Sequence, residues 1–199
     1  MKQNESLFDP YMRFKADLKV RYVYYYNGSP ESWADNPRFR GKNVEEMRDY
    51  MAMIYDLNPR LFKSPEQIAQ IKDLSDEDYR FVRIVETSDG REARIRDFND
   101  LMRRPSESEI SAALKKMISE PPLVGFIQGH GERSTTRPGD RDYTNFSIER
   151  YSRSALVNQG FDVCEIDLSK GDSIPEEVSM LVLADMKTPF TERETALID

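Results

Sequence analysis

The sequence predicts an α/β protein made of two small α/β units. Three observations predict this class: a period-two run of β-prone residues near the N-terminus, helix starts marked by capping residues, and short apolar runs in the last third that are typical of a parallel sheet. We expect an N-terminal extension at residues 1–16, a first unit at residues 17–120 and a parallel α/β unit at residues 121–199. The boundary is placed at Pro121-Pro122, which ends the preceding helix.

The first unit is expected to combine a strand, helices and a hairpin. Alternating residues of high β-propensity predict a strand over residues 17–26, and Asn27–Pro30 breaks it ahead of a loop that runs to Gly41. Two β-prone runs on either side of Asp89-Gly90 predict a β-hairpin over residues 81–98. Helices are expected to begin at three capping residues, namely Asn43, Ser64 and Ser106.

The second unit is expected to run strand, helix, strand, strand. The helix is placed at Thr144–Gln159, with Gly160 in the position that commonly follows a helix. Thr191 and Glu194 form a capping box for a further helix close to the last residue, so we expect the sequence to be a piece of a longer protein. The three strands are placed at residues 123–128, 161–168 and 179–184, the first and last of them apolar enough to be buried.

Composition argues against several classes of protein. With 29 Lys and Arg against 36 Asp and Glu, the formal charge is −7, and no long basic run favours nucleic-acid binding. The longest apolar run, Met180–Ala184, is far shorter than the ~20 residues of a membrane helix, so we expect this segment not to be membrane-inserted. The single cysteine, Cys164, excludes an internal disulfide and a cysteine-rich zinc site.

The candidate site follows the first strand of the second unit. Gly129-His130-Gly131-Glu132-Arg133 lies at a strand end, where parallel sheets bind ligands, and Asp185 follows the third strand. His130 and Glu132 could act as acid and base or as metal ligands, but two ligands make a poor metal site, so we expect no metal and no cofactor. The alternative is a tight turn in which both side chains bond local backbone. The candidate ligand-binding residues are His130, Glu132, Arg133 and Asp185.

The sequence offers no clear nucleophile. Cys164 lies inside a predicted strand, where we expect a thiol to be inert, and no G-x-S-x-G motif occurs. We therefore expect no catalytic residue. The loop after the candidate site carries charges of both signs, which either clamp an anion or pair with one another at the surface; they are Arg133, Arg137, Asp140, Arg141 and Asp142.

Six motifs follow one another in the last third of the chain. LVGFIQ runs into Gly-His-Gly-Glu, and Gly-Phe-x-Val, Ile-Pro-x-x-Val, Leu-Val-x-Ala and Thr-x-x-Glu come after it. In this order they resemble the gliding-motility-type auxiliary domain family of ABC transporters, an uncharacterised ABC-2-type transport system. The resemblance extends more loosely toward residue 17.

The resemblance implies a fold, a location and partners. The second unit would be a parallel sheet similar to the glutamine-amidotransferase-like (flavodoxin-like) fold without its cysteine elbow, and the first unit would be thioredoxin-like without C-x-x-C. The chain would be a periplasmic portion of an inner-membrane permease or auxiliary subunit, with membrane-embedded transporter subunits and an ATP-binding subunit as partners. A non-catalytic role through partner or cargo contacts is thus the first hypothesis. The alternatives are a small-molecule or glycan-binding domain that uses the loops around His130, and a hydrolase or amidotransferase.

Overall fold

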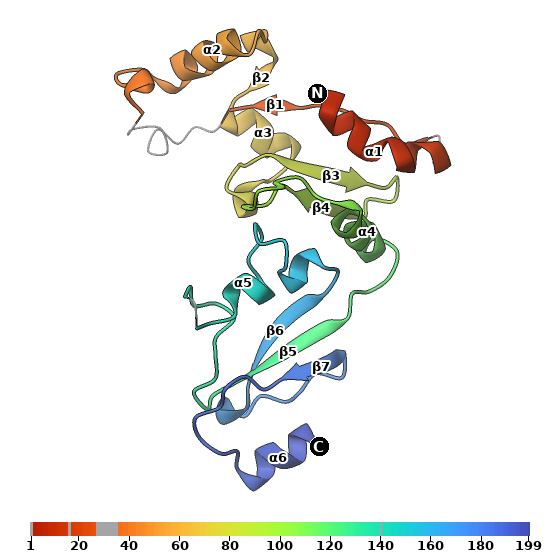
Figure 1. The fold of residues 1–199 in the computed structure, drawn as a ribbon, viewed down its shortest axis with the longest axis vertical. Coiled ribbons are helices and arrows are strands. Elements are labelled where there is room, and N and C mark those ends of the chain that lie inside the picture. The colour runs from red at the N-terminus through yellow and green to blue at the C-terminus, as the bar shows by residue number, and fades with distance from the viewer. Residues whose placement is uncertain (1, 16, 27–35, 140) are drawn as a thin grey trace. The chain divides into compact units, whose positions relative to one another are not determined.

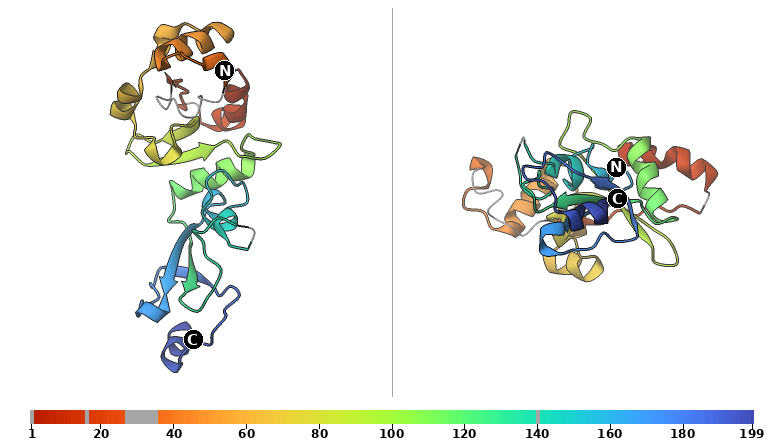
Figure 2. Two further views of the ribbon diagram at one scale, coloured as in Figure 1. Left: turned by 90° about the vertical axis from the view of Figure 1, so that its left-hand side faces the viewer. Right: turned by 90° about the horizontal axis from the view of Figure 1, so that it is seen from below.

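The protein has a mixed α/β architecture, as predicted (Figure 1, Figure 2). It is described from a computed structural model that covers residues 2–15, 17–26, 36–139 and 141–199. The chain divides into two compact units, Met1–Arg80 and Phe81–Asp199. The second of these contains the small three-stranded parallel sheet that the last third of the sequence predicts.

Short strands and capped helices make up the first unit. Strand β1 (Tyr24–Tyr25) pairs in parallel with β2 (Phe62–Lys63), so the strand predicted over residues 17–26 is wrong in its length. The reason is that β2 is confined between a 3-10 turn that ends at Leu61 and the helix cap at Ser64. The helical segments are α1 (Lys2–Phe14), η2 (Pro37–Phe39), α2 (Val44–Ile54), η3 (Pro59–Leu61), α3 (Pro65–Ile71) and η4 (Ser75–Glu77).

The N-terminal part of this unit is helical, and the extension expected at residues 1–16 stays a prediction. Helix α1 occupies most of the segment that was expected to be an extension. The turn predicted at Asn27–Pro30 lies outside the described residues, as does most of the loop after it. The helix start predicted at Asn43 is confirmed, because the Asn43 Oδ1 atom accepts from the Glu46 amide at 2.8 Å and a Glu46 carboxylate oxygen accepts from the Asn43 amide at 2.9 Å.

The second unit starts with the predicted hairpin and helix. Strands β3 (Val82–Glu86) and β4 (Glu92–Arg96) pair antiparallel around the Asp89-Gly90 turn. Helix α4 (Glu107–Lys116) follows from a capping box between Ser106 and Glu109, as predicted.

The parallel sheet has the strand order β6-β5-β7. It consists of β5 (Leu123–Gln128), β6 (Asp162–Asp167) and β7 (Val178–Val182), so the three predicted strands are confirmed. A 3-10 turn, η6 (Leu168–Lys170), follows β6, and helix α6 (Glu192–Ile198) begins at the predicted Thr191 cap.

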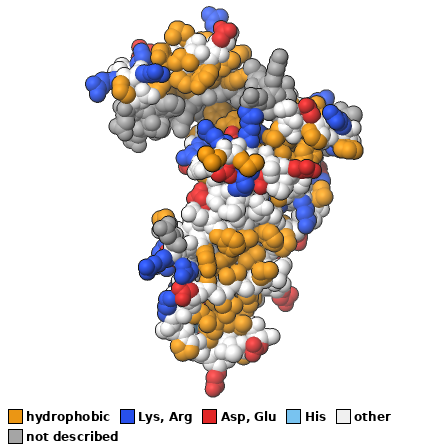
Figure 3. Space-filling view, viewed as in Figure 1, with side chains coloured by type: hydrophobic (Ala, Val, Ile, Leu, Met, Phe, Trp, Pro, Cys, Tyr) orange, Lys and Arg blue, Asp and Glu red, His pale blue; other side chains and the backbone are white. Residues whose placement is uncertain are grey.

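Apolar side chains from all three strands pack on one face of the sheet. Ile127, Ile166 and Leu168 form a buried cluster, against which Phe190 and Ile198 pack from the segment that contains α6. In Figure 3 hydrophobic side chains gather over this part of the molecule. The outer strand β7 is only partly buried and not fully buried as predicted: Ser179 and Met180 on it are exposed, whereas Val178 and Leu181 pack against the apolar cluster. Met180 is 59% exposed.

The helix predicted over Thr144–Gln159 is wrong. Only α5 (Thr144–Ser147) and a 3-10 turn, η5 (Leu156–Asn158), form there. The Asn158 side-chain amide donates to the carbonyls of Arg150 and Ser152, both at 2.9 Å. These carbonyl groups are thereby used by a side chain instead of by a helical backbone ladder.

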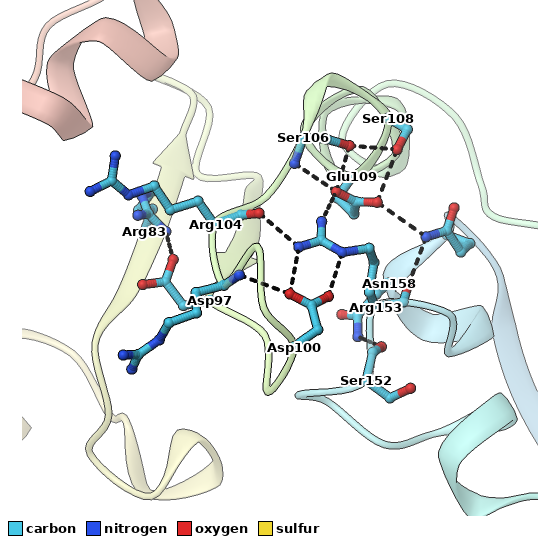
Figure 4. A network of polar contacts seen from close by, with 12 residues as sticks. Arg83, Asp97, Asp100, Arg104, Ser106, Ser108, Glu109, Ser152, Arg153 and Asn158 are labelled. Carbon is cyan, nitrogen blue, oxygen red and sulfur yellow. Dashed lines mark hydrogen bonds and ion pairs between the residues drawn. The ribbon is translucent and has the colours of Figure 1, made fainter.

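The hairpin and α4 group with the parallel sheet, whereas the sequence placed a boundary after residue 120. Figure 4 shows the polar network that joins residues 81–120 to the segment around Arg153. Arg153, in the segment before η5, pairs with Asp100 and Glu109 at 2.7 Å each and donates to the Arg104 carbonyl at 2.8 Å. The predicted boundary stays a prediction, and the described contacts hold residues 81–120 to the later segment.

Candidate functional site

Two glycines shape the turn that follows β5. Gly129 and Gly131 have φ angles of 112° and 79°, which favour glycine. A Cβ atom on Gly129 would lie 2.6 Å from Asp167 Oδ1, and one on Gly131 would lie 2.9 Å from Lys187 Cγ. Glycine at these positions therefore lets the turn lie against the segments that follow β6 and β7.

His130 is buried at the centre of this turn and faces two carboxylates. Its Nδ1 atom lies 3.7 Å from Glu132 Oε1, and its Nε2 atom lies 3.3 Å from Glu194 Oε2. The ring makes an edge contact with Phe190, with centroids 4.6 Å apart. The His130 carbonyl accepts from the amides of Lys187 at 2.8 Å and Thr188 at 3.2 Å, which fixes the turn to the segment before α6.

Glu132 folds back on its own turn. Its Oε2 atom accepts from the His130 amide at 2.6 Å. Its Oε1 atom is buried and has no hydrogen-bond partner, as is also true of His130 Nδ1. This local hydrogen bond is the kind expected if the residues form a tight turn that bonds its own backbone. It leaves Glu132 Oε1 and His130 Nδ1 facing each other without a hydrogen bond.

Glu194 belongs to this cluster, although the sequence analysis identified it only as a capping residue. Its Oε2 atom accepts from the Thr191 amide and the Thr191 hydroxyl, both at 2.7 Å. These hydrogen bonds, with a smaller contribution from His130, hold the pKa of the Glu194 carboxyl below its usual range. No sequence signal connected Glu194 to His130, because the two are far apart in the chain.

Arg133 and Asp185, the other two candidate residues, form an exposed ion pair. Arg133 Nη2 lies 3.2 Å from Asp185 Oδ2, and Lys187 Nζ lies 2.6 Å from Asp185 Oδ1. The hydrogen bond from Lys187 lowers the pKa of Asp185. Arg133 also donates to the Arg141 carbonyl at 2.7 Å. The four predicted residues thus separate into a buried pair and a surface pair.

The loop after Arg133 is tied down by short polar side chains that the sequence analysis missed. The Thr135 hydroxyl donates to Glu165 Oε1 at 2.6 Å, and the Ser147 hydroxyl donates to the Tyr143 carbonyl at 2.6 Å. Thr135 and Ser147 are both buried. Arg137 pairs with Asp142 at 3.5 Å, as a surface network would, and Asp140 lies outside the described residues.

Other chemical features of the described residues lie apart from this site. Burial raises the pKa of the half-buried Cys164 thiol on β6. No group of three or more His, Cys, Asp or Glu side chains in the described part of the chain is arranged to hold a metal ion. A pocket of about 340 Å³ lies between β4, α4 and residues 157–160, and none of the four candidate residues lines it.

In the part of the chain that the structure covers, no helix is long and apolar enough to cross a bilayer.

Comparison with known proteins identifies a family for residues 121–199. Residues 121–199, which contain the whole parallel sheet and the candidate site, match the model of the family described as "ABC-type uncharacterized transport system". No curated protein and no solved structure matches the chain. Residues 121–199 are therefore a domain of this ABC-type transport system family.

Proposed function

We propose that this chain is a non-catalytic, extracytoplasmic domain of an ABC-2-type transporter permease or auxiliary subunit of the gliding-motility type, and that it acts through contacts with partner proteins or cargo. The observation that carries the proposal is the family match over residues 121–199. Membrane-embedded subunits and an ATP-binding subunit are the proposed partners. The proposed fold of this domain is a glutamine-amidotransferase-like parallel sheet.

The geometry of the candidate site supports a non-catalytic role. Both ring nitrogens of His130 face carboxylates, and the ring is buried, so a substrate would have to displace these groups before the histidine could exchange a proton with it. Cys164 lies on a strand with a raised thiol pKa, whereas a nucleophilic thiol needs a lowered one. Neither residue has the arrangement that acyl transfer requires.

The proposed location can be tested by thiol labelling. Ser173 is exposed, whereas Cys164 is half-buried, so a Ser173→Cys substitution in a Cys164→Ser background gives a single reactive thiol. We expect a membrane-impermeant maleimide to label this thiol in cells whose outer membrane alone has been permeabilised. Labelling only after the inner membrane is disrupted would contradict an extracytoplasmic location. The Cys164→Ser parent is the unlabelled control.

The proposed partners can be tested by purification from membranes. We expect the tagged natural protein, solubilised in mild detergent, to retain a polytopic membrane protein and an ATP-binding protein. Recovery of neither after chemical crosslinking in intact cells would contradict the transporter assignment.

A ligand-binding role is the second candidate, and one observation favours it. Arg133, Asp185 and Lys187 are partly exposed where β5 and β7 end, the position at which parallel sheets commonly bind ligands. A thermal-shift screen with sugars, nucleotides and divalent metals tests it. A shift that an Arg133→Gln substitution abolishes would support binding here, and no shift with any compound would contradict it.

A further inference from the structure

The buried histidine couples two separate segments of the second unit. His130 is the only histidine in the sequence. Its side chain is 8% exposed, and it lies between Glu132 of its own turn, at 3%, and Glu194 of α6, at 6%. Three ionisable groups are thus enclosed in one small volume, in which charge interactions are stronger than at the surface.

The protonation state of His130 decides how many of these contacts are favourable. A neutral imidazole carries one N–H and one lone pair, whereas an imidazolium donates from both nitrogens. Since Nδ1 faces Glu132 and Nε2 faces Glu194, the neutral ring must direct a lone pair toward one of two carboxylates. Only the imidazolium can satisfy both, and a small shift would close the 3.7 Å separation at Nδ1 into a hydrogen bond.

The other charged groups around the turn already have their own partners. Asp185 pairs with Lys187 and Arg133 on the segment after β7, and Asp167 beside Gly129 pairs with Lys170 at 2.7 Å. Among the described residues, neither Glu132 nor Glu194 forms an ion pair with a lysine or arginine. When protonated, His130 is therefore the cation that faces both buried carboxylates.

Helix α6 depends on few other contacts. Its side chains are mostly exposed, apart from Glu194 and the half-buried Ile198, which packs with Phe190 on the apolar cluster of the sheet. Losing the contact from His130 would therefore remove one of the contacts that join α6 to the sheet and to the turn after β5.

We propose that His130 is a pH-operated latch: its protonated form holds α6 against the turn after β5, and loss of the proton releases α6 and uncovers the apolar cluster beneath Phe190 and Ile198. The release takes place as pH rises, because the imidazolium is the form that both carboxylates favour. This inference concerns the second unit alone and does not rest on the proposed transport function.

The single histidine makes the test direct. Carbon-detected NMR of the 199-residue chain between pH 5 and 9 follows one imidazole, and hydrogen exchange of the Thr195 and Asp199 amides, corrected for intrinsic rates, reports the opening of α6. We expect the protection of these amides to fall about tenfold or more with the same midpoint as the imidazole. Protection that stays constant while His130 titrates would overturn the proposal, and so would a histidine that does not titrate in this range.

Three variants separate the latch from general stability. Glu194→Gln keeps an oxygen that can accept from Thr191 but removes the charge that faces His130, so the pH dependence of α6 protection should disappear. His130→Gln should give low protection at every pH. Glu192→Gln is the matched control, because Glu192 is exposed in the same helical turn, and it should behave as the unmodified chain does. Persistence of the pH dependence in Glu194→Gln would also contradict the latch.

Discussion

Two buried glutamates of the second unit show how one local motif acquires two different properties. Glu109 and Glu194 each close a capping box at a helix start, and each is 6% exposed. Glu109 faces Arg153 at 2.7 Å, whereas Glu194 faces His130 at 3.3 Å. Arginine is charged at every physiological pH and histidine is not, so the first contact is permanent and the second is conditional.

The two surroundings differ in hydrogen bonding as well as in charge. Burial alone would raise the pKa of Glu109, but hydrogen bonds from Ser106 and Ser108 and the charge of Arg153 hold it below its usual range. Around His130, by contrast, Nδ1 and Glu132 Oε1 are buried without a hydrogen-bond partner. A network in which every polar group has a hydrogen-bond partner holds its segments together. A network with unpartnered polar groups holds them less firmly, so a second arrangement of the segments costs less free energy.

The largest predicted effect is on the permanent contact. Arg153→Met keeps much of the apolar stem but leaves Glu109 buried without its cation, so we expect the free energy of unfolding to fall by about 3 kcal/mol in urea titrations. Arg150→Met, at an exposed position nearby, is the control and should change it little. Equal effects of the two substitutions would mean that the network in Figure 4 contributes no special stability.

The next effect concerns the turn that carries His130. Gly131→Ala should cost about 2 kcal/mol, because alanine disfavours the φ of 79° and its Cβ would approach Lys187 to 2.9 Å. Gly90→Ala in the hairpin has a similar φ of 87° with no atom near its Cβ, and it should cost about 1 kcal/mol. If the two variants have the same stability in urea, then the turn is not held closely against Lys187.

A third prediction is that acid affects the two regions in opposite ways. The pKa of Glu109 lies below its ordinary value of 4.5, so its contribution to stability is complete above that pH and is lost as pH falls through the lower folded value. The unmodified chain should therefore lose more stability between pH 6 and pH 3 than Arg153→Met does, whereas the contact at His130 weakens as pH rises. Parallel acid sensitivity in the two proteins would contradict this role for Glu109.

The smallest effect is expected at the surface pair of the candidate site. Asp185→Asn keeps a residue that tolerates the φ of 60° at this position and removes only an exposed charge. The thermal unfolding midpoint should not change measurably. A clear loss of stability would show that Arg133 and Asp185 do more than pair at the surface.

The sequence predicted those elements that depend on neighbouring residues. Capping boxes at Asn43, Ser106 and Thr191 involve residues three positions apart, so their helix starts were predicted correctly. The apolar strands of the parallel sheet were also found, because each is a short continuous run.

What the sequence could not predict depends on residues that are distant in the chain. The helix was predicted over Thr144–Gln159 because Gly160 follows that segment, but Asn158 bonds backbone carbonyls that a helix would need. The apolar run of β7 was predicted to be buried, but which of its side chains are covered depends on segments distant in the chain, and Met180 is left exposed. The candidate site shows the same limit: His130 and Glu132 were identified from the turn, whereas Glu194 joins them only in the folded chain.

The most direct test of the comparison is hydrogen exchange of both helices in one sample of the unmodified chain at pH 6 and pH 8.5. The Ile110 amide reports α4, and the Thr195 amide reports α6. After correction for intrinsic exchange rates, we expect the protection of the α4 amide to stay constant and that of the α6 amide to be about tenfold lower at the higher pH. Equal changes in the two helices, or none in either, would contradict the distinction between a permanent and a conditional contact.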